Sequence, residues 1–226
     1  MNLPSGFRER LNRFRKYARM TNAWSLARRY LVIGAFDGVL TILGMILGYY
    51  FSGEIINPKI IFTSGVAASA ALGLSSAWGA WEAESAERSL EICQMEHALL
   101  RNLDGSVNQE AANFAVTWTS FVHGVSPIPA GILPLIPFFF ADPLPSMLMS
   151  NELLHMLAII VYRTYPLANP TSSITISATA IALGVLFVLG VFLGRTARKN
   201  IIKAGLRMVL AGVVTAAISL LIGAAH

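Results

Sequence analysis

One acidic residue lies inside an apolar stretch that is long enough to cross a membrane. Residues 31–51 read LVIGAFDGVLTILGMILGYYF, and Asp37 is their only charged residue. About 20 apolar residues suffice to span a bilayer. An ionised carboxylate that faces lipid costs on the order of several kcal/mol, so such residues usually face a protein interior or a water path. We expect Asp37 to be either an ion or proton site, or a structural polar residue that is hydrogen-bonded within a helix bundle.

Small residues accompany Asp37 along the same stretch. Gly34, Gly38, Gly44 and Gly48 form a face without bulky side chains. Such a face lets two membrane helices approach each other closely. The pattern predicts that the helix carrying Asp37 packs tightly on another helix, with Asp37 on the buried side.

A second group of acidic residues follows, outside the apolar stretches. Residues 82–110 hold seven acids and two arginines. At 3.6 residues per turn, Glu84, Glu87, Glu91 and Met95 fall on one stripe, where the carboxylates repel one another. A divalent cation would relieve that repulsion, and carboxylate with thioether suits Fe²⁺ or Mn²⁺ better than Ca²⁺. The alternative interpretation is a solvated acidic face without a ligand.

His123 is the third candidate, in an apolar segment that is rich in proline. A histidine inside a membrane bundle either relays protons or binds metal, or it is simply hydrogen-bonded to a neighbour. Proline removes backbone hydrogen bonds, and a span tolerates this only where neighbours or water satisfy the freed carbonyls. We therefore expect a kinked or broken helix at Pro127, Pro129, Pro134 and Pro137.

The composition indicates a membrane protein rather than a soluble domain. Of the 226 residues, 55% are hydrophobic and 13% are charged, whereas soluble domains carry about 25% charged residues. The net charge is +5. The basic residues cluster at the expected membrane edges, which argues against nucleic-acid binding. The single cysteine, Cys93, excludes an intrachain disulfide and a cysteine-based zinc site.

These patterns predict an all-α integral membrane protein with five transmembrane helices per protomer. The second helix is expected to continue past Trp81 out of the membrane and to stop at Asp104 and Gly105. The N-terminal segment reads either as an amphipathic helix on an anionic membrane face or as a plain basic flank. The expected segments are the N-terminal segment at 1–29, spans one and two at 30–81, an acidic cytoplasmic helix at 82–112, span three at 113–141, an outer interfacial segment at 142–173, and spans four and five at 174–226.

Basic residues predict the orientation of these spans. The N-terminal segment and the loop at 195–203 are both rich in Arg and Lys, and such loops usually stay in the cytoplasm. Five spans place both on the cytoplasmic side and leave the C-terminus outside. A sixth span at 147–165 would move the basic loop outside, so we favour five spans.

Four stretches together resemble a known family. They read GAFDGVLTILGMILG, ALGLSSAWGAWEAESAER, ILPLIPFFF and LGVFLGRTARKNIIKAGLRMVLAGVVTAAISLLIG. Their order and spacing are similar to those of the vacuolar iron transporter and calcium-cross-complementer family, in a short prokaryotic-type form. The resemblance covers roughly residues 30–141 and 174–223.

The resemblance implies a homodimer that moves Fe²⁺ or Mn²⁺ out of the cytoplasm in exchange for protons. The ion path would run between the two first spans, with Asp37 of both protomers as the membrane site and with Gly38, Thr41 and Ser76 beside the path. The acidic segment would correspond to the family's cytoplasmic metal-collecting domain. Glu84, Glu87, Glu91 and Met95, chosen by helical phase, are the candidate ligands there, and His123 is a candidate proton relay.

The sequence departs from the family pattern at the end of the second span. Family members usually carry a methionine and a glutamate where this chain has Ser76 and Ala80, and its cytoplasmic part is one helix instead of about three. The metal and the proton coupling are therefore open, and so is the role of residues 142–170.

We expect a transporter, no enzyme and no bound cofactor, in the plasma membrane of a prokaryote with a cytoplasmic N-terminus. The alternative function is a membrane metal sensor or scaffold that uses the acidic helix and transports nothing.

Overall fold

The computed structural model describes residues 5–52, 57–140 and 170–224, and every element in these ranges is helical. Five helices are long and apolar enough to cross a membrane: Ala23–Phe51, Pro58–Leu99, Val107–Phe139, Ser173–Thr196 and Ile201–Gly223. The expected all-α fold is confirmed for the described residues, and these contain five candidate spans; the sixth span considered at 147–165 lies outside them. Most of the expected outer segment at 142–173 lies outside the described residues.

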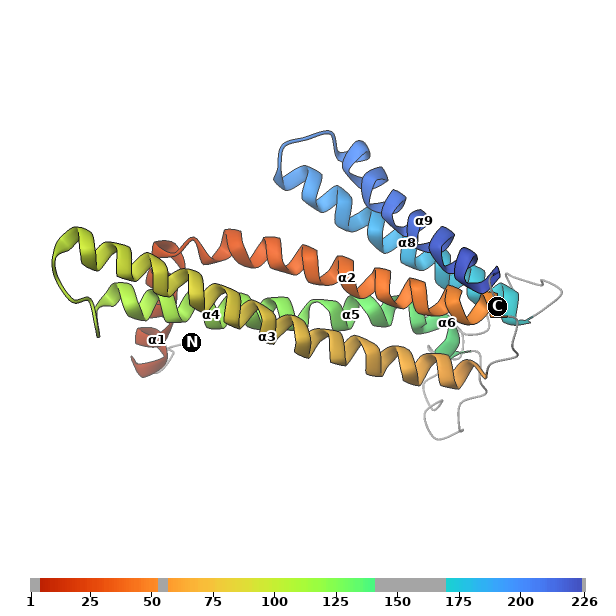
Figure 1. Cartoon of the computed structure of the whole chain (residues 1–226), viewed down its shortest axis with the longest axis horizontal. Coiled ribbons are helices and arrows are strands. Elements are labelled where there is room, and N and C mark those ends of the chain that lie inside the picture. Colours follow the sequence, from red (N-terminus) through yellow and green to blue (C-terminus); the bar gives the residue numbers. More distant parts are fainter. Residues whose placement is uncertain (1–4, 53–56, 141–169, 225–226) are drawn as a thin grey trace. The chain divides into compact units, whose positions relative to one another are not determined.

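Figure 1 shows the helices in the order in which they follow one another along the chain. Their bounds are α1 Ser5–Met20, α2 Ala23–Phe51, α3 Pro58–Leu99, α4 Val107–Val125, α5 Pro127–Ile132, the 3₁₀ helix η1 Leu133–Leu135, α6 Ile136–Phe139, α8 Pro170–Thr196 and α9 Ile201–Ala224.

Two helices, α1 and α2, share residues 5–29. α1 ends at Met20 because Asn22 has a φ of 51°, a left-handed conformation that asparagine tolerates better than most residues. The Thr21 hydroxyl donates a hydrogen bond to the Tyr17 carbonyl at 2.8 Å and caps the helix end. The residues from Ala23 onward belong to the first long helix.

α3 continues without interruption from Pro58 to Leu99, as the absence of Pro and Gly beyond Trp81 predicts. It ends earlier than the expected stop at Asp104 and Gly105. Leu100 has a φ of 49°, and the Arg101 amide donates to the Glu96 carbonyl at 3.2 Å, the hydrogen bond of a left-handed helix terminus. The Glu96 carboxylate also accepts from the Leu103 amide at 2.8 Å, which holds the following turn.

The third apolar segment is broken, as its prolines predict. α4 ends at Val125, and the chain then forms α5, η1 and α6 as short pieces. Pro127 starts α5, and Pro134 and Pro137 stand in the first turns of η1 and α6. Proline has no amide hydrogen, so each piece begins where the missing donor is least costly.

The described chain divides into two compact units, which are described separately. Unit 1 comprises Met1–Gly34 and Leu72–Ser126. In it the Phe14 ring of α1 packs edge-on against Phe114 and Trp118 of α4, with centroid distances of 4.9 and 5.4 Å. The part of the α1 apolar face whose side chains are described therefore packs on protein, which the sequence did not predict.

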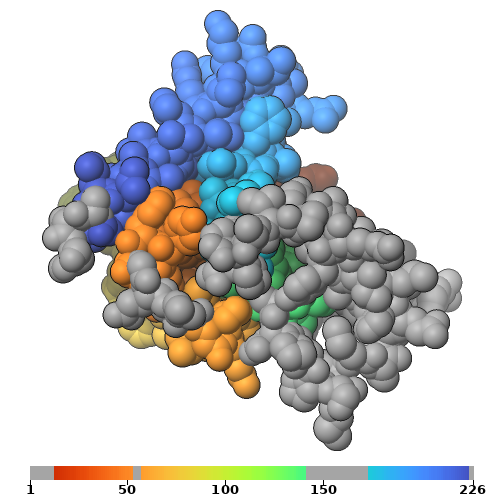
Figure 2. Space-filling view, turned by 90° about the vertical axis from the view of Figure 1, so that its right-hand side faces the viewer, coloured from red at the N-terminus to blue at the C-terminus, as the bar shows by residue number. Residues whose placement is uncertain are grey.

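Unit 2 comprises Ala35–Ala71 and Pro127–His226. Its core holds Val39 and Leu43 of α2 with Leu186 of α8, and Ile42 and Ile46 with Leu135 and Phe138. α8 and α9 pair closely, and their side chains lie against each other in the space-filling view (Figure 2). A Cβ on Gly190 would lie 2.6 Å from the Ala204 carbonyl oxygen, so this close approach requires glycine.

Candidate functional site

In unit 2, one side of α2 carries polar and small residues. Val39 and Ile46 are completely buried in the core. Asp37, Thr41 and Gly48 are spaced four and seven residues apart, which places them together on the opposite side of the helix. Asp37 is half-buried and Thr41 is exposed. A Cβ added to Gly48 would meet no atom within 4 Å, whereas one added to Gly44, on the same side, would lie 3.4 Å from the Thr215 methyl of α9. This side of α2 is therefore open at Gly48 and contacted by α9 at Gly44.

Gly38 has a different role, inside the protomer. A Cβ there would lie 2.5 Å from the Pro127 carbonyl oxygen and 2.8 Å from its Cα. The predicted close helix partner of α2 therefore exists, and it is α5 of the same chain. The sequence grouped Gly38 with Gly48 on one face of small residues, whereas in the structure Gly38 is buried against Pro127 and Gly48 has open space beside it.

In unit 1, two carboxylates of the expected metal stripe are held by protein partners. Glu84 is 3% exposed and accepts a hydrogen bond from the Tyr30 hydroxyl at 2.7 Å. Arg88 lies between the two acids, with its Nε 3.8 Å from Glu84 and its Nη1 2.6 Å from Glu91. The arginine relieves the repulsion for which the sequence suggested a metal ion.

The other members of the stripe stay apart from this pair. Glu87 is exposed and forms no ion pair with a described residue. Met95 packs against the cluster of Ile92, Leu103 and Ala112. Among the described side chains of the single chain, no group of three or more His, Cys, Asp or Glu residues is arranged to hold a metal ion. The metal stripe thus stays a prediction.

His123 binds the protein backbone. Its Nδ1 lies 3.0 Å from the Tyr30 carbonyl oxygen, and the two rings are 5.0 Å apart. A carbonyl only accepts, so Nδ1 carries the proton and Nε2 of a neutral ring is an acceptor. A Cβ on Gly34 would overlap the Ser126 hydroxyl and approach His123, so Gly34 permits this contact. The hydrogen-bonded alternative for His123 is observed, and its proton relay stays a prediction.

Sequence reasoning missed Tyr30 and Arg88. Tyr30 connects Glu84 of α3 with His123 of α4, and no local pattern in the sequence indicates this. Arg88 was detectable, because it lies four residues after Glu84 and three before Glu91, the spacings of helical ion pairs. Ser76, the remaining expected path residue, is half-buried on α3 in unit 1.

A second tyrosine–carboxylate pair joins α1 to α4. The Tyr17 hydroxyl donates a hydrogen bond to the Glu110 carboxylate. This hydrogen bond is the largest cause of a raised pKa of Tyr17 relative to the usual value of 10.0. The neutral phenol is the donor that the carboxylate needs, so deprotonation breaks the contact.

Comparisons with known proteins agree with the resemblance of the sequence motifs. Residues 28–111 match the VIT family. An uncharacterised protein of Methanocaldococcus jannaschii is 29% identical over 193 residues, which cover 84% of each chain. The VIT match contains Asp37, the Gly34–Gly38 pair and the acidic part of α3. It indicates membrane metal transport in general, and it supports the assignment of this chain to the VIT family.

Proposed function

We propose that this protein moves Fe²⁺ or Mn²⁺ out of the cytoplasm in exchange for protons. The observation that carries the proposal is the polar side of α2, where Asp37, Thr41 and Gly48 share one stripe opposite the buried core residues. In a homodimer with these stripes facing each other, the two Asp37 carboxylates would line one path. The cargo is the substrate, and no resident cofactor is needed.

Two carboxylates that share a site supply the coupling of metal to protons. They cannot both ionise cheaply without a cation between them. Arrival of a divalent ion therefore releases a proton, and its departure on the other side allows a proton to return. Thr41, one turn from Asp37, adds a hydroxyl that can replace water around the ion.

The acidic part of α3 would collect the metal. Glu87 and Glu91 are exposed, and a local excess of carboxylates raises the concentration of cations near them. In the proposal a metal ion competes with Arg88 for Glu84 and Glu91 and takes Met95 as a soft ligand, which requires local movement of α3. This competition favours weak binding, which suits a collecting site.

The alternative function is a sensor or scaffold that binds metal through α3 without transport. The ion pairs of Arg88 with Glu84 and Glu91 support this alternative, because they stabilise a metal-free state of α3. Membership of a transporter family agrees with a protein that is not an enzyme.

Uptake into proteoliposomes distinguishes the two functions. Fe²⁺, Mn²⁺, Co²⁺, Zn²⁺ and Ca²⁺ would be offered with and without a pH gradient. We expect uptake of Fe²⁺ or Mn²⁺ that is driven by the gradient and is lost in Asp37→Asn, which keeps the shape of the side chain but cannot ionise. Asp104→Asn, in the exposed turn before α4, is the matched control.

Two outcomes would contradict the transport mechanism. Metal binding without uptake by the unmodified protein would establish the sensor instead. Uptake by Asp37→Asn at the original rate, and with the original pH dependence, would show that Asp37 is structural.

A further inference from the structure

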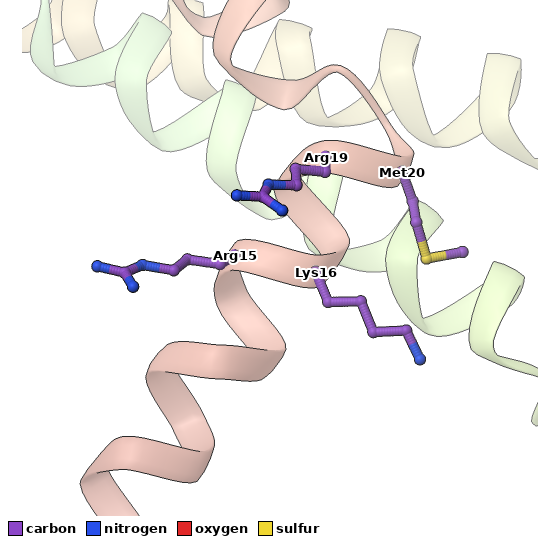
Figure 3. Close-up of a pocket in the computed structure, with 4 residues that line it drawn as sticks. All are labelled: Arg15, Lys16, Arg19 and Met20. Atoms are coloured by element: carbon purple, nitrogen blue, oxygen red, sulfur yellow. The ribbon is translucent and has the colours of Figure 1, made fainter.

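A hollow lies against the exposed side of α1. It has a volume of about 470 Å³ and is lined by Arg15, Lys16, Arg19 and Met20 (Figure 3). These residues occupy two adjacent turns of the helix, so Arg15 with Arg19 and Lys16 with Met20 form two pairs with a spacing of four residues. The opposite side of α1 packs on α4 through Phe14.

The three cations of the hollow are not neutralised by the described protein. Arg15, Lys16 and Arg19 are exposed, and none forms an ion pair with a described residue. The acid that contacts α1, Glu110, is held by Tyr17 on the packed side of the helix. Arg15 and Arg19 repel each other at this spacing, and a bound anion would relieve that repulsion.

The chemistry of the hollow fits a phosphate group. Arg15 and Arg19 point to the same side of α1, and Lys16 and Met20 to the other (Figure 3). The guanidinium of arginine offers paired donors that match two phosphate oxygens, and Lys16 adds a point charge nearby. Met20 contributes the one apolar wall of the hollow. The ligand is therefore expected to carry an anionic phosphate beside an apolar part.

The position of the hollow in the chain favours a lipid. Met20 precedes the first candidate span, which begins at Ala23. Trp24 and Phe121 are 59% and 60% exposed, and Trp118 lies between them with ring distances of 6.1 and 6.4 Å. Exposed aromatic rings of this kind gather at the headgroup level of a membrane, which is also where lipid phosphates are found.

We propose that this hollow is a binding site for the phosphate of an anionic phospholipid headgroup. The lipid would hold α1 against the membrane while Phe14 and Tyr17 hold it against α4. This site lies on the face of α1 that does not pack on α4, and it does not depend on whether the chain transports metal.

Lipid retention by the purified full-length protein tests the site. Native mass spectrometry in detergent would count phosphatidylglycerol or phosphatidylcholine molecules that stay bound. We expect phosphatidylglycerol to be retained in preference to phosphatidylcholine. Changing Arg15, Lys16 and Arg19 together to Gln should weaken retention of phosphatidylglycerol on the order of 100-fold, from the usual contribution of each cation near an anionic surface.

A second set of three cations provides the matched control. Arg195, in the last turn of α8, and Arg198 and Lys199, in the turn that follows, are exposed, and changing them to Gln removes the same charge elsewhere. This control should retain phosphatidylglycerol as the unmodified protein does. An equal loss in both triple variants, or in neither, would overturn the site.

Two further measurements keep the result interpretable. The side chains are exposed, so the triple variant should melt at the same temperature as the unmodified protein in phosphatidylcholine, and only the stabilisation by phosphatidylglycerol should disappear. If the triple variant aggregates, Arg19→Gln alone should weaken retention on the order of 5-fold. Complete displacement of the lipid by inorganic phosphate would overturn the proposal, because it would identify a free anion as the ligand.

Discussion

Glu84 is a buried carboxylate that accepts a hydrogen bond from a neutral donor, the Tyr30 hydroxyl, beside the longer ion pair with Arg88. The side chain is almost completely buried, and the Tyr30 hydroxyl is its closest described partner. A buried charged acceptor that loses its donor retains its desolvation cost. The contact joins residues that are 54 positions apart in the chain, so it holds α2 to α3 within unit 1.

We predict that Tyr30→Phe destabilises the protein by about 1–3 kcal/mol, the cost of an unsatisfied buried polar group. Unfolding in detergent, followed by circular dichroism, measures this change. Tyr50→Phe is the matched control, since Tyr50 is exposed and donates no hydrogen bond to a described residue. In the double variant Tyr30→Phe with Glu84→Gln, the loss should be smaller than the sum of the two single losses. Strict additivity would show that the two side chains do not interact.

The Tyr17–Glu110 pair predicts a pH dependence of the α1 contact. Because the pKa of Tyr17 is raised above 10.0, the folded protein holds this proton more tightly than the unfolded chain. The stabilisation is complete below the unfolded pKa and is lost as the pH rises through the folded pKa. Ultraviolet titration of the unmodified protein should contain one more late-ionising tyrosine than that of Tyr17→Phe, and Glu110→Gln should bring the pKa of Tyr17 back toward the usual value. An unchanged number of late-ionising tyrosines in Tyr17→Phe would show that the pKa of Tyr17 is not raised.

At the level of elements, α2 uses its glycines on two different sides. Gly38 makes room for the backbone of Pro127, whereas Gly48 has open space beside it. Gly38 therefore serves the packing of one protomer, and Gly48 is available to a second copy. One pattern of small residues in the sequence thus divides into two roles.

We predict that the same substitution changes the stability of the protomer at one of these glycines and not at the other. Gly38→Ala should destabilise the protomer by about 1–3 kcal/mol, the usual cost of overpacking, because the Pro127 backbone cannot move away easily. Gly48→Ala should leave protomer stability unchanged, and unfolding in detergent compares the two. Gly48→Leu should weaken crosslinking of a dimer while the protomer stays folded. Unchanged crosslinking would remove the first span from the dimer contact.

At the level of the whole molecule, the orientation in the membrane can be tested with thiol reagents. The native Cys93 is exposed on α3, and the topology predicted from the basic loops places it in the cytoplasm. Cysteines at Thr196 and Ser52, each introduced in a Cys93→Ser background, mark the turn after α8 and the end of α2. We expect an impermeant reagent to label Cys93 and Thr196→Cys from one side, and Ser52→Cys from the other. Labelling of all three from one side would exclude the five-span topology.

The local features of the fold were predictable because each depends on nearby residues alone. The length and hydropathy of each apolar run determine whether it can span a membrane, so five candidate spans are found in the described residues, as predicted. A proline within a helix removes a backbone hydrogen bond and is tolerated only in the first turn, so the interruption of the third span at Pro127, Pro134 and Pro137 was confirmed. The helix ends at Met20 and Leu99 were less accurate, since they depend on a left-handed residue and on capping hydrogen bonds.

The sequence by itself determined which residues carry charge within or beside apolar segments, and so it identified Asp37, Glu84 and His123. Only the tertiary structure decided which partners they have: the Tyr30 hydroxyl for Glu84, the Tyr30 carbonyl for His123, and Arg88 between Glu84 and Glu91. It also decided that Gly38 faces Pro127. The physical reason is that partner choice depends on the rotation and register of whole helices. These are set by the packing of many side chains together, and no short stretch of sequence contains that information.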